Sequence, residues 1–192
     1  MRAALLIFTM LTGAGAQGVI DRVAVVVGNQ VITDTEVRTE VRLTQFLNGQ
    51  PMDLSAAARR QAAERLVDQQ LIRGEMEIGG YQAPAGSEAD TLLRQFRQQN
   101  YPSDVAFRAV LEKYGLTEES VKRHLIWQVA ALRFAEQRFR ITNPPQTAES
   151  ADRLVDRTLP ASSKAEEEDE MDAWLKQARS GIRIQFKKEA FQ

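Results

Sequence analysis

His124 has the side chain best suited to general base catalysis near neutral pH, because imidazole titrates in that range. It is the only histidine of the 192-residue chain and stands beside Arg123. The chain has no cysteine, which excludes thiol catalysis. It also has no G-x-S-x-G, phosphate-binding or dinucleotide-binding glycine motif. A lone histidine within a helical pattern favours a surface or packing residue, so we predict no catalytic residue and no enzyme.

An acidic run from Glu166 to Glu170, followed by Asp172, could attract a cation. Consecutive carboxylates point in different directions around a helix, however, so they do not form a cage. Acidic residues are favourable at the positive N-terminal end of a helix. We therefore interpret the run as the solvated start of a helix, and we predict neither a metal site nor a cofactor.

Basic side chains recur along the segment from Glu118 to Arg140 and could attract an anionic partner. They are Lys122, Arg123, Arg133, Arg138 and Arg140, and Glu118, Glu119 and Glu136 offset them. The formal net charge of the chain is −1, which gives no electrostatic reason to bind nucleic acid. This pattern favours a solvated helix face.

The remaining chemistry is apolar contact. Large apolar side chains near breaks between predicted helices can keep part of their surface uncovered, and there they could bind extended polypeptide segments. The candidates for such client binding are Met52, Leu92, Phe96 and Tyr101. An apolar helix stripe more often faces a core, and both interpretations remain open.

The elements that would position these residues begin with a β-hairpin. Val23, Val25 and Val27 alternate before a Gly28-Asn29 turn and a second short run. Thr33-x-x-Glu36 is a capping-box pattern that predicts a helix start at Thr33. At the other end of the chain, apolar and polar residues alternate over residues 182–187, which predicts a strand. We therefore expect the two chain ends to form one small sheet, with a mainly helical chain between them.

Helices are predicted in four further segments before the tandem prolines Pro144 and Pro145. They run from Asp53 or Ser55 to about Ile78, from Ser87 to Gln99, from Ser103 or Asp104 onward, and from Thr117 to about Phe139. In the last of these, Val121, Leu125, Val129, Leu132 and Phe139 would share one buried face. A final helix would follow the acidic run and contain Trp174.

The first 16 residues have the composition of a secretory signal peptide. Arg2 precedes the apolar run Ala3 to Leu11, and small residues end at Ala16, so we expect cleavage between Ala16 and Gln17. The run is too short for a membrane span, and no later segment is apolar and long enough for stable membrane insertion. We therefore expect an exported protein that folds without disulfides.

Several stretches occur in a distinctive order behind this N-terminal segment. They are Asp21 to Thr33, Glu64 to Ile72, Tyr114 to Leu116, Arg138 to Ile141, Asp172 to Arg179, and Ile182 to Ile184. This order and spacing resemble the SurA family of periplasmic chaperones for outer-membrane proteins. The resemblance covers most of residues 19–141 and 166–186. It implies a periplasmic location and a chaperone core made by the N-terminal domain together with the C-terminal helix and strand.

One part of that family pattern is missing. SurA-like proteins usually carry parvulin-type prolyl isomerase domains, with paired histidines, between the two parts of the core. Here only the polar stretch 142–165 stands at that place, and His124 lies elsewhere. The predicted organisation is therefore a signal peptide (1–16), a SurA-like helical domain (17–141), a linker (142–165), and a C-terminal helix and strand (166–192).

Three functions follow from this pattern as hypotheses. The first is an ATP-independent holdase that binds unfolded exported or outer-membrane proteins through an apolar groove. The second is an assembly protein that docks one fixed partner, or a second copy of itself by exchange of the helical arm. The third is a peptidyl-prolyl isomerase that depends on His124.

Overall fold

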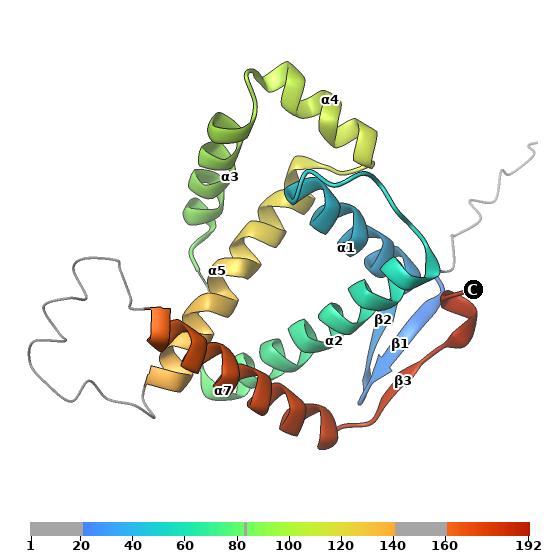
Figure 1. Cartoon of the computed structure of the whole chain (residues 1–192), viewed down its shortest axis with the longest axis vertical. Coiled ribbons are helices and arrows are strands. Elements are labelled where there is room, and N and C mark those ends of the chain that lie inside the picture. The colour runs from blue at the N-terminus through green and yellow to red at the C-terminus, as the bar shows by residue number, and fades with distance from the viewer. Residues whose placement is uncertain (1–20, 83, 141–160) are drawn as a thin grey trace, which may run out of the picture.

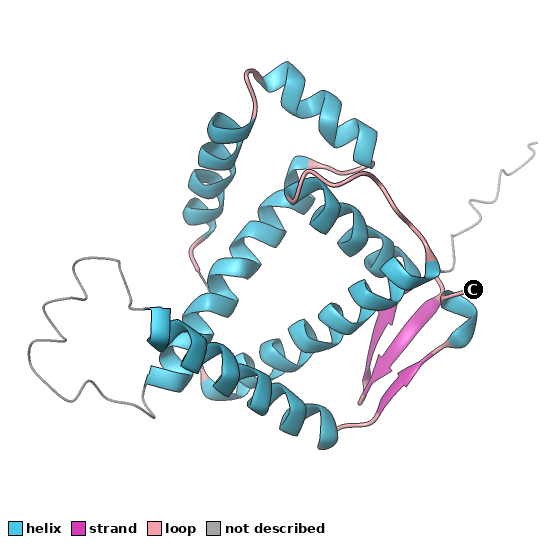
Figure 2. Cartoon of the chain, viewed as in Figure 1, coloured by secondary structure: helices cyan, strands magenta, loops and turns pink. Residues whose placement is uncertain are grey.

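The computed structural model describes residues 21–82, 84–140 and 161–192. The described chain is mainly helical, with one small antiparallel sheet at one side of the molecule (Figure 1, Figure 2). The helices are α1 (Asp34–Leu47), α2 (Ala56–Gly79), α3 (Gly86–Asn100), α4 (Asp104–Tyr114), α5 (Glu118–Arg140) and α7 (Ala161–Ser180). The strands are β1 (Val23–Val27), β2 (Gln30–Thr33) and β3 (Ile184–Phe186), and a short 3-10 helix, η1 (Lys188–Ala190), follows β3.

The expectation that the two chain ends share a sheet is confirmed. The strand order is β2-β1-β3, so the C-terminal strand pairs with the first strand of the N-terminal hairpin. Val26 of β1 is paired with Val31 on one side and with Gln185 on the other. Gly28 turns the hairpin with a φ of 59°, a left-handed conformation that glycine adopts without a Cβ clash. A Cβ at this position would lie 2.9 Å from Cδ1 of Ile182.

Side-chain caps fix the starts of the first two helices. The hydroxyl of Thr33 accepts a hydrogen bond from the backbone N–H of Glu36, whose carboxylate accepts one from the N–H of Thr33, so the predicted capping box is confirmed. Ser55, one of two predicted caps, accepts from the N–H of Ala58 at the start of α2. These caps determine where the chain leaves the sheet and where α2 begins to cross it.

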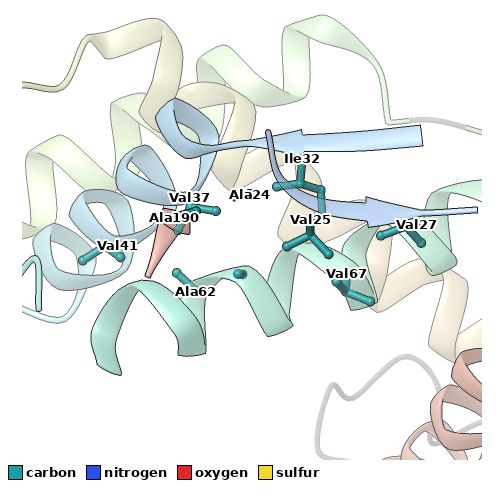
Figure 3. Close-up of a cluster of buried hydrophobic side chains, with 10 residues drawn as sticks. Ala24, Val25, Val27, Ile32, Val37, Val41, Ala62, Val67 and Ala190 are labelled. Atoms are coloured by element: carbon teal, nitrogen blue, oxygen red, sulfur yellow. The ribbon is translucent and has the colours of Figure 1, made fainter. Parts of the chain in front are cut away.

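The first core lies between the sheet and α2 (Figure 3). It is built from small and β-branched side chains, which let the helix approach the sheet closely. Its buried members are Ala24, Val25, Val27, Ile32, Val37, Val41, Ala62, Ala63, Val67 and Ala190. Because Ala190 follows β3 and is only 2% exposed, the end of the chain is part of this core.

The second core lies where α1 meets α3, α4 and the start of α5. Its buried members are Leu43, Phe46, Leu93, Phe107, Leu111, Tyr114, Leu116 and Val121. Helix α1 contributes to both cores, with Val37 and Val41 in the first and Leu43 and Phe46 in the second. This helix therefore joins the sheet to the outer helices.

Two arginine side chains, one on α7 and one on α2, join α2 to the C-terminal segment. The guanidinium of Arg179 on α7 contacts Asp68 Oδ1 at 2.7 Å and Glu64 Oε2 at 2.8 Å, both on α2. Arg59 of α2 is buried and donates to the carbonyl oxygens of Ala190 at 2.7 Å and Gln192 at 2.9 Å. Charge-assisted hydrogen bonds of this kind are stronger than neutral ones.

The predicted helices are present with small differences in their ends. Helix α3 runs from Gly86 to Asn100, one residue longer at each end than predicted, and Gly80 ends α2 in the left-handed conformation. Helix α7 begins at Ala161, so residues 161–165 are helical where we expected linker. The proposed signal peptide and the rest of the 142–165 linker lie outside the described residues. None of the described helices is long and apolar enough to cross a bilayer.

Replacing Arg179 by alanine should lower the free energy of unfolding by about 1 kcal/mol, because two charge-assisted contacts to α2 are lost at a partly exposed position. Denaturant unfolding followed by circular dichroism measures this change. Lys176→Ala is the matched control, since Lys176 is exposed on the same helix. Equal stability of the two variants would contradict the role given to Arg179.

The same variant should respond differently to acid. Burial raises the pKa of the Glu64 carboxyl, but hydrogen bonds from Arg179 and Arg60 outweigh it and hold that pKa below its ordinary value. Such a carboxylate adds stability above its unfolded pKa of about 4.3. The contribution is lost as pH falls through the lower folded-state pKa. Arg179→Ala should therefore lose less free energy of unfolding than the unchanged protein when the pH is lowered through this range.

Candidate functional site

Five aromatic side chains from α1, α3, α4 and the α3–α4 connection gather in the second core. This aromatic cluster comprises Phe46, Phe96, Tyr101, Phe107 and Tyr114. The ring of Phe46 is central, with ring centroids at 5.8 Å from Phe96, 6.2 Å from Tyr101, 6.2 Å from Phe107 and 5.7 Å from Tyr114. Ring separations in this range are typical of favourable aromatic packing.

Two predicted client-binding residues, Phe96 and Tyr101, form the outer part of the aromatic cluster. Their ring centroids lie 6.0 Å apart, and both side chains are half-buried. Beneath them, Phe46 is 3% exposed and Phe107 is fully buried. Burial raises the pKa of the Tyr101 phenol, with a smaller contribution from Tyr114, so the hydroxyl stays neutral at physiological pH. Phe96 and Tyr101 thus keep part of their apolar surface exposed above the buried rings of Phe46 and Phe107.

Met52, a third predicted residue, is 42% exposed in the connection between α1 and α2. The buried amide of Gln45 fixes this connection by donating to the carbonyl oxygen of Asp53 and accepting from its N–H, both at 2.8 Å. The hydroxyl of Tyr114 donates to the carbonyl oxygen of Gln50 at 2.6 Å. The loop that contains Met52 is therefore attached to a member of the aromatic cluster.

Leu92, the fourth predicted residue, lies apart from the aromatic cluster. It is half-buried on α3, and its neighbour Leu93 is the residue of that pair that enters the second core. Ion pairs hold α3 against α5, with Arg133 Nη2 at 2.6 Å from Glu88 Oε2 and Lys122 Nζ at 2.5 Å from Asp90 Oδ1. The structure thus brings together Phe96 and Tyr101, links the loop of Met52 to them, and leaves Leu92 outside.

An open cavity of about 580 Å³ lies beside the loop that contains Met52. Amide and small side chains line most of it, including Gln45, Gln50 and Gln61. Glutamine amides both donate and accept hydrogen bonds, so the exposed Gln50 and Gln61 can contact polypeptide main chain without selecting one side-chain type.

A second cavity of about 250 Å³ lies where α1, α2 and α5 meet, and it contains His124. The carboxylate of Glu40 faces this cavity, and Glu40 is only 5% exposed. Glu40 Oε1 lies 3.5 Å from Arg65 Nε and 3.5 Å from Gln69 Nε2, and its Oε2 lies 3.6 Å from His124 Nδ1. Glu40 was not predicted from the sequence, although its spacing from Val37 and Val41 places it on the buried side of α1.

This arrangement places His124 in a packing position, half-buried between helices. A histidine with a carboxylate beside it has the composition of a general base and its orienting group, but the 3.6 Å separation exceeds hydrogen-bond length. In the described part of the chain no three acidic, histidine or cysteine side chains converge to hold a metal ion.

No model of a known protein family matches this chain, and no curated protein matches it significantly.

Phe46→Ala should lower the free energy of unfolding by about 3–5 kcal/mol, because it removes the central ring of the aromatic cluster and leaves a cavity. Phe96→Ala should cost about 1–2 kcal/mol, since Phe96 is half-buried. Urea unfolding monitored by circular dichroism measures both values. Losses of equal size would show that Phe96 belongs to the core and offers no free surface.

Proposed function

We propose that this chain is a SurA-like, ATP-independent periplasmic chaperone that binds unfolded exported proteins, including outer-membrane proteins, by apolar contact. The observation that supports this most is the half-buried pair Phe96 and Tyr101, packed on the buried rings of the aromatic cluster, with the exposed Met52 on a loop that Tyr114 attaches to the same cluster. The activity needs neither a covalent step nor a nucleotide, because binding alone keeps an unfolded client from aggregating.

The energetics favour broad and modest binding. Full burial of one large apolar side chain contributes about 1.5–3 kcal/mol before the cost of ordering the client. Phe96 and Tyr101 already bury part of their surface, and so each can contribute only a fraction of that value. Rings and thioether sulfur adapt to many apolar partners, which suits a protein that binds unrelated segments.

The pairing of an N-terminal hairpin with a C-terminal strand supports the proposed identity, because the SurA resemblance implies a core made from both ends of the chain. Helix α7 precedes β3 in the order that the resemblance implies. A core of this kind does not depend on isomerase domains for its closure, so a minimal chaperone can fold without them.

The direct test dilutes an unfolded outer-membrane β-barrel protein out of denaturant and follows its light scattering, with and without the purified chain from Gln17 onward. Near-stoichiometric suppression without nucleotide is the expected result. Unchanged scattering over a wide excess would refute holdase activity for this client class. That outcome would favour the alternative function, docking of one fixed partner or a second copy.

Met52→Ser should weaken suppression in the same assay by about fivefold in apparent affinity, because an exposed apolar contact worth about 1 kcal/mol is removed. Ile78→Ser is the matched control. Ile78 is 86% exposed near the far end of α2, and at 1.5 Å per residue this lies about 33 Å along the helix from its start. A loss as large for Ile78→Ser would show that the binding surface lies elsewhere.

A further inference from the structure

The outer edge of β3 is unpaired within the described residues. β3 is the last strand in the order β2-β1-β3, and Figure 1 shows it at the side of the sheet away from β2. An unpaired edge offers main-chain donors and acceptors to any extended polypeptide. Natural proteins usually cover such edges or keep them short, and β3 is short, with three residues.

The hydrogen bonds between β3 and β1 determine which groups of β3 face outward. The N–H of Gly28 donates to the carbonyl oxygen of Arg183 at 2.9 Å. The N–H of Lys187 donates to the carbonyl oxygen of Ala24 at 2.8 Å. Gln185 is paired with Val26 between them. Because the two directions alternate along an antiparallel strand, the N–H and C=O groups of Ile184 and Phe186 point away from β1. No described group forms a hydrogen bond with them.

The two faces of this edge differ in chemistry. On the core face, Ile184 and Phe186 are half-buried against the first core, and the guanidinium of Arg60 lies 3.5 Å from the Phe186 ring centroid. On the opposite face, Arg183 and Lys187 are exposed and flank Gln185. A strand added here would therefore meet an apolar surface on one face and two positive charges on the other.

These charges select among possible occupants. In a second copy added antiparallel, the register that joins Ile184 to Phe186 of the other copy would place Arg183 opposite Lys187 of that copy. Like charges directly opposite each other destabilise a strand pair, so this register of self-association is disfavoured. A strand with acidic residues at alternate positions would place them opposite Arg183 and Lys187, and its apolar residues would extend the core face.

We propose that the outer edge of β3 binds an extended polypeptide segment with alternating apolar and acidic residues, which adds to the sheet as a fourth strand. Main-chain bonds to Ile184 and Phe186 would supply affinity, and Arg183 and Lys187 would supply the preference for acidic residues. The source of the segment, an unfolded client, rests on the proposed function, whereas the edge and its charges do not.

The test uses the full chain and a fluorescent heptapeptide of alternating valine and glutamate, with a valine and lysine peptide for comparison. Anisotropy measures binding, and amide hydrogen exchange locates it. Near-saturating acidic peptide should slow exchange of the Ile184 and Phe186 amides by about tenfold and leave those of Arg183, Gln185 and Lys187 unchanged. Binding without this protection would overturn the proposal, as would absence of binding.

The double variant Arg183→Glu/Lys187→Glu supplies the charge control, because both side chains are exposed and outside the core. It should bind the acidic peptide about tenfold more weakly and the basic peptide more tightly. Unchanged preference would contradict the selection by charge. Circular dichroism verifies that the variant is folded.

The aggregation assay separates this proposal from the proposed function. If the chain suppresses aggregation but the Ile184 and Phe186 amides remain unprotected by the acidic peptide, the proposal of peptide binding at the β3 edge is wrong. The proposed chaperone function is then unaffected. If those amides are protected but suppression is absent, the edge stands as a docking site for a fixed partner and the chaperone function fails.

Discussion

The antiparallel pairing of β3 with β1 is the contact on which the rest of the structure depends. Without β3, the sheet would be a two-stranded hairpin that depends on its packing against α2, because an isolated hairpin is only marginally stable in water. β3 places Ala190 in the first core, and Arg59 then binds the carbonyl oxygen of Ala190 across a sequence separation of 131 residues. Contacts this distant in sequence must overcome the entropy of closing a long loop before they stabilise the fold.

The division into two cores explains how the protein can be stably packed and still expose part of its apolar surface. The first core uses small and β-branched side chains between the sheet and α2 and is closed by the end of the chain (Figure 3). The second uses large rings, and its outer members Phe96 and Tyr101 remain half-buried. Helix α1 connects the two, and Glu40 lies on it between their apolar residues, with contacts no shorter than 3.5 Å. The proposed client-binding surface is therefore joined to the sheet through α1, which contributes to both cores.

The sequence predicted features that local chemistry determines. The capping box at Thr33, the Gly28 turn, the Ser55 cap and the alternating strand near the C-terminus all depend on residues close in the chain. Long-range packing was harder to predict. Leu132 was expected on the buried face of α5 but is 59% exposed, because the elements packed against α5 change along its length, from α3 to α7. This expectation was wrong.

The candidate site was predictable only where it depends on local sequence features. Composition and helix breaks singled out Phe96, Tyr101 and Met52, and their exposure in the structure is compatible with binding. The attachment of the Met52 loop by Gln45 and Tyr114 required a tertiary structure, as did the separation of Leu92 from the aromatic cluster. A glutamine that binds the main chain of a following loop, as Gln45 binds Asp53, looks no different in sequence from one on a solvated helix face.

Site-specific photocrosslinking can test whether unfolded clients bind at the aromatic cluster. A photoreactive phenylalanine analogue in place of Tyr101 keeps the ring, and the same analogue in place of Ile78 serves as the comparison. With an unfolded outer-membrane protein present, we expect strong crosslinks to the client from position 101 and few from position 78. Equal crosslinking from both positions, or none from position 101, would contradict client binding at the aromatic cluster.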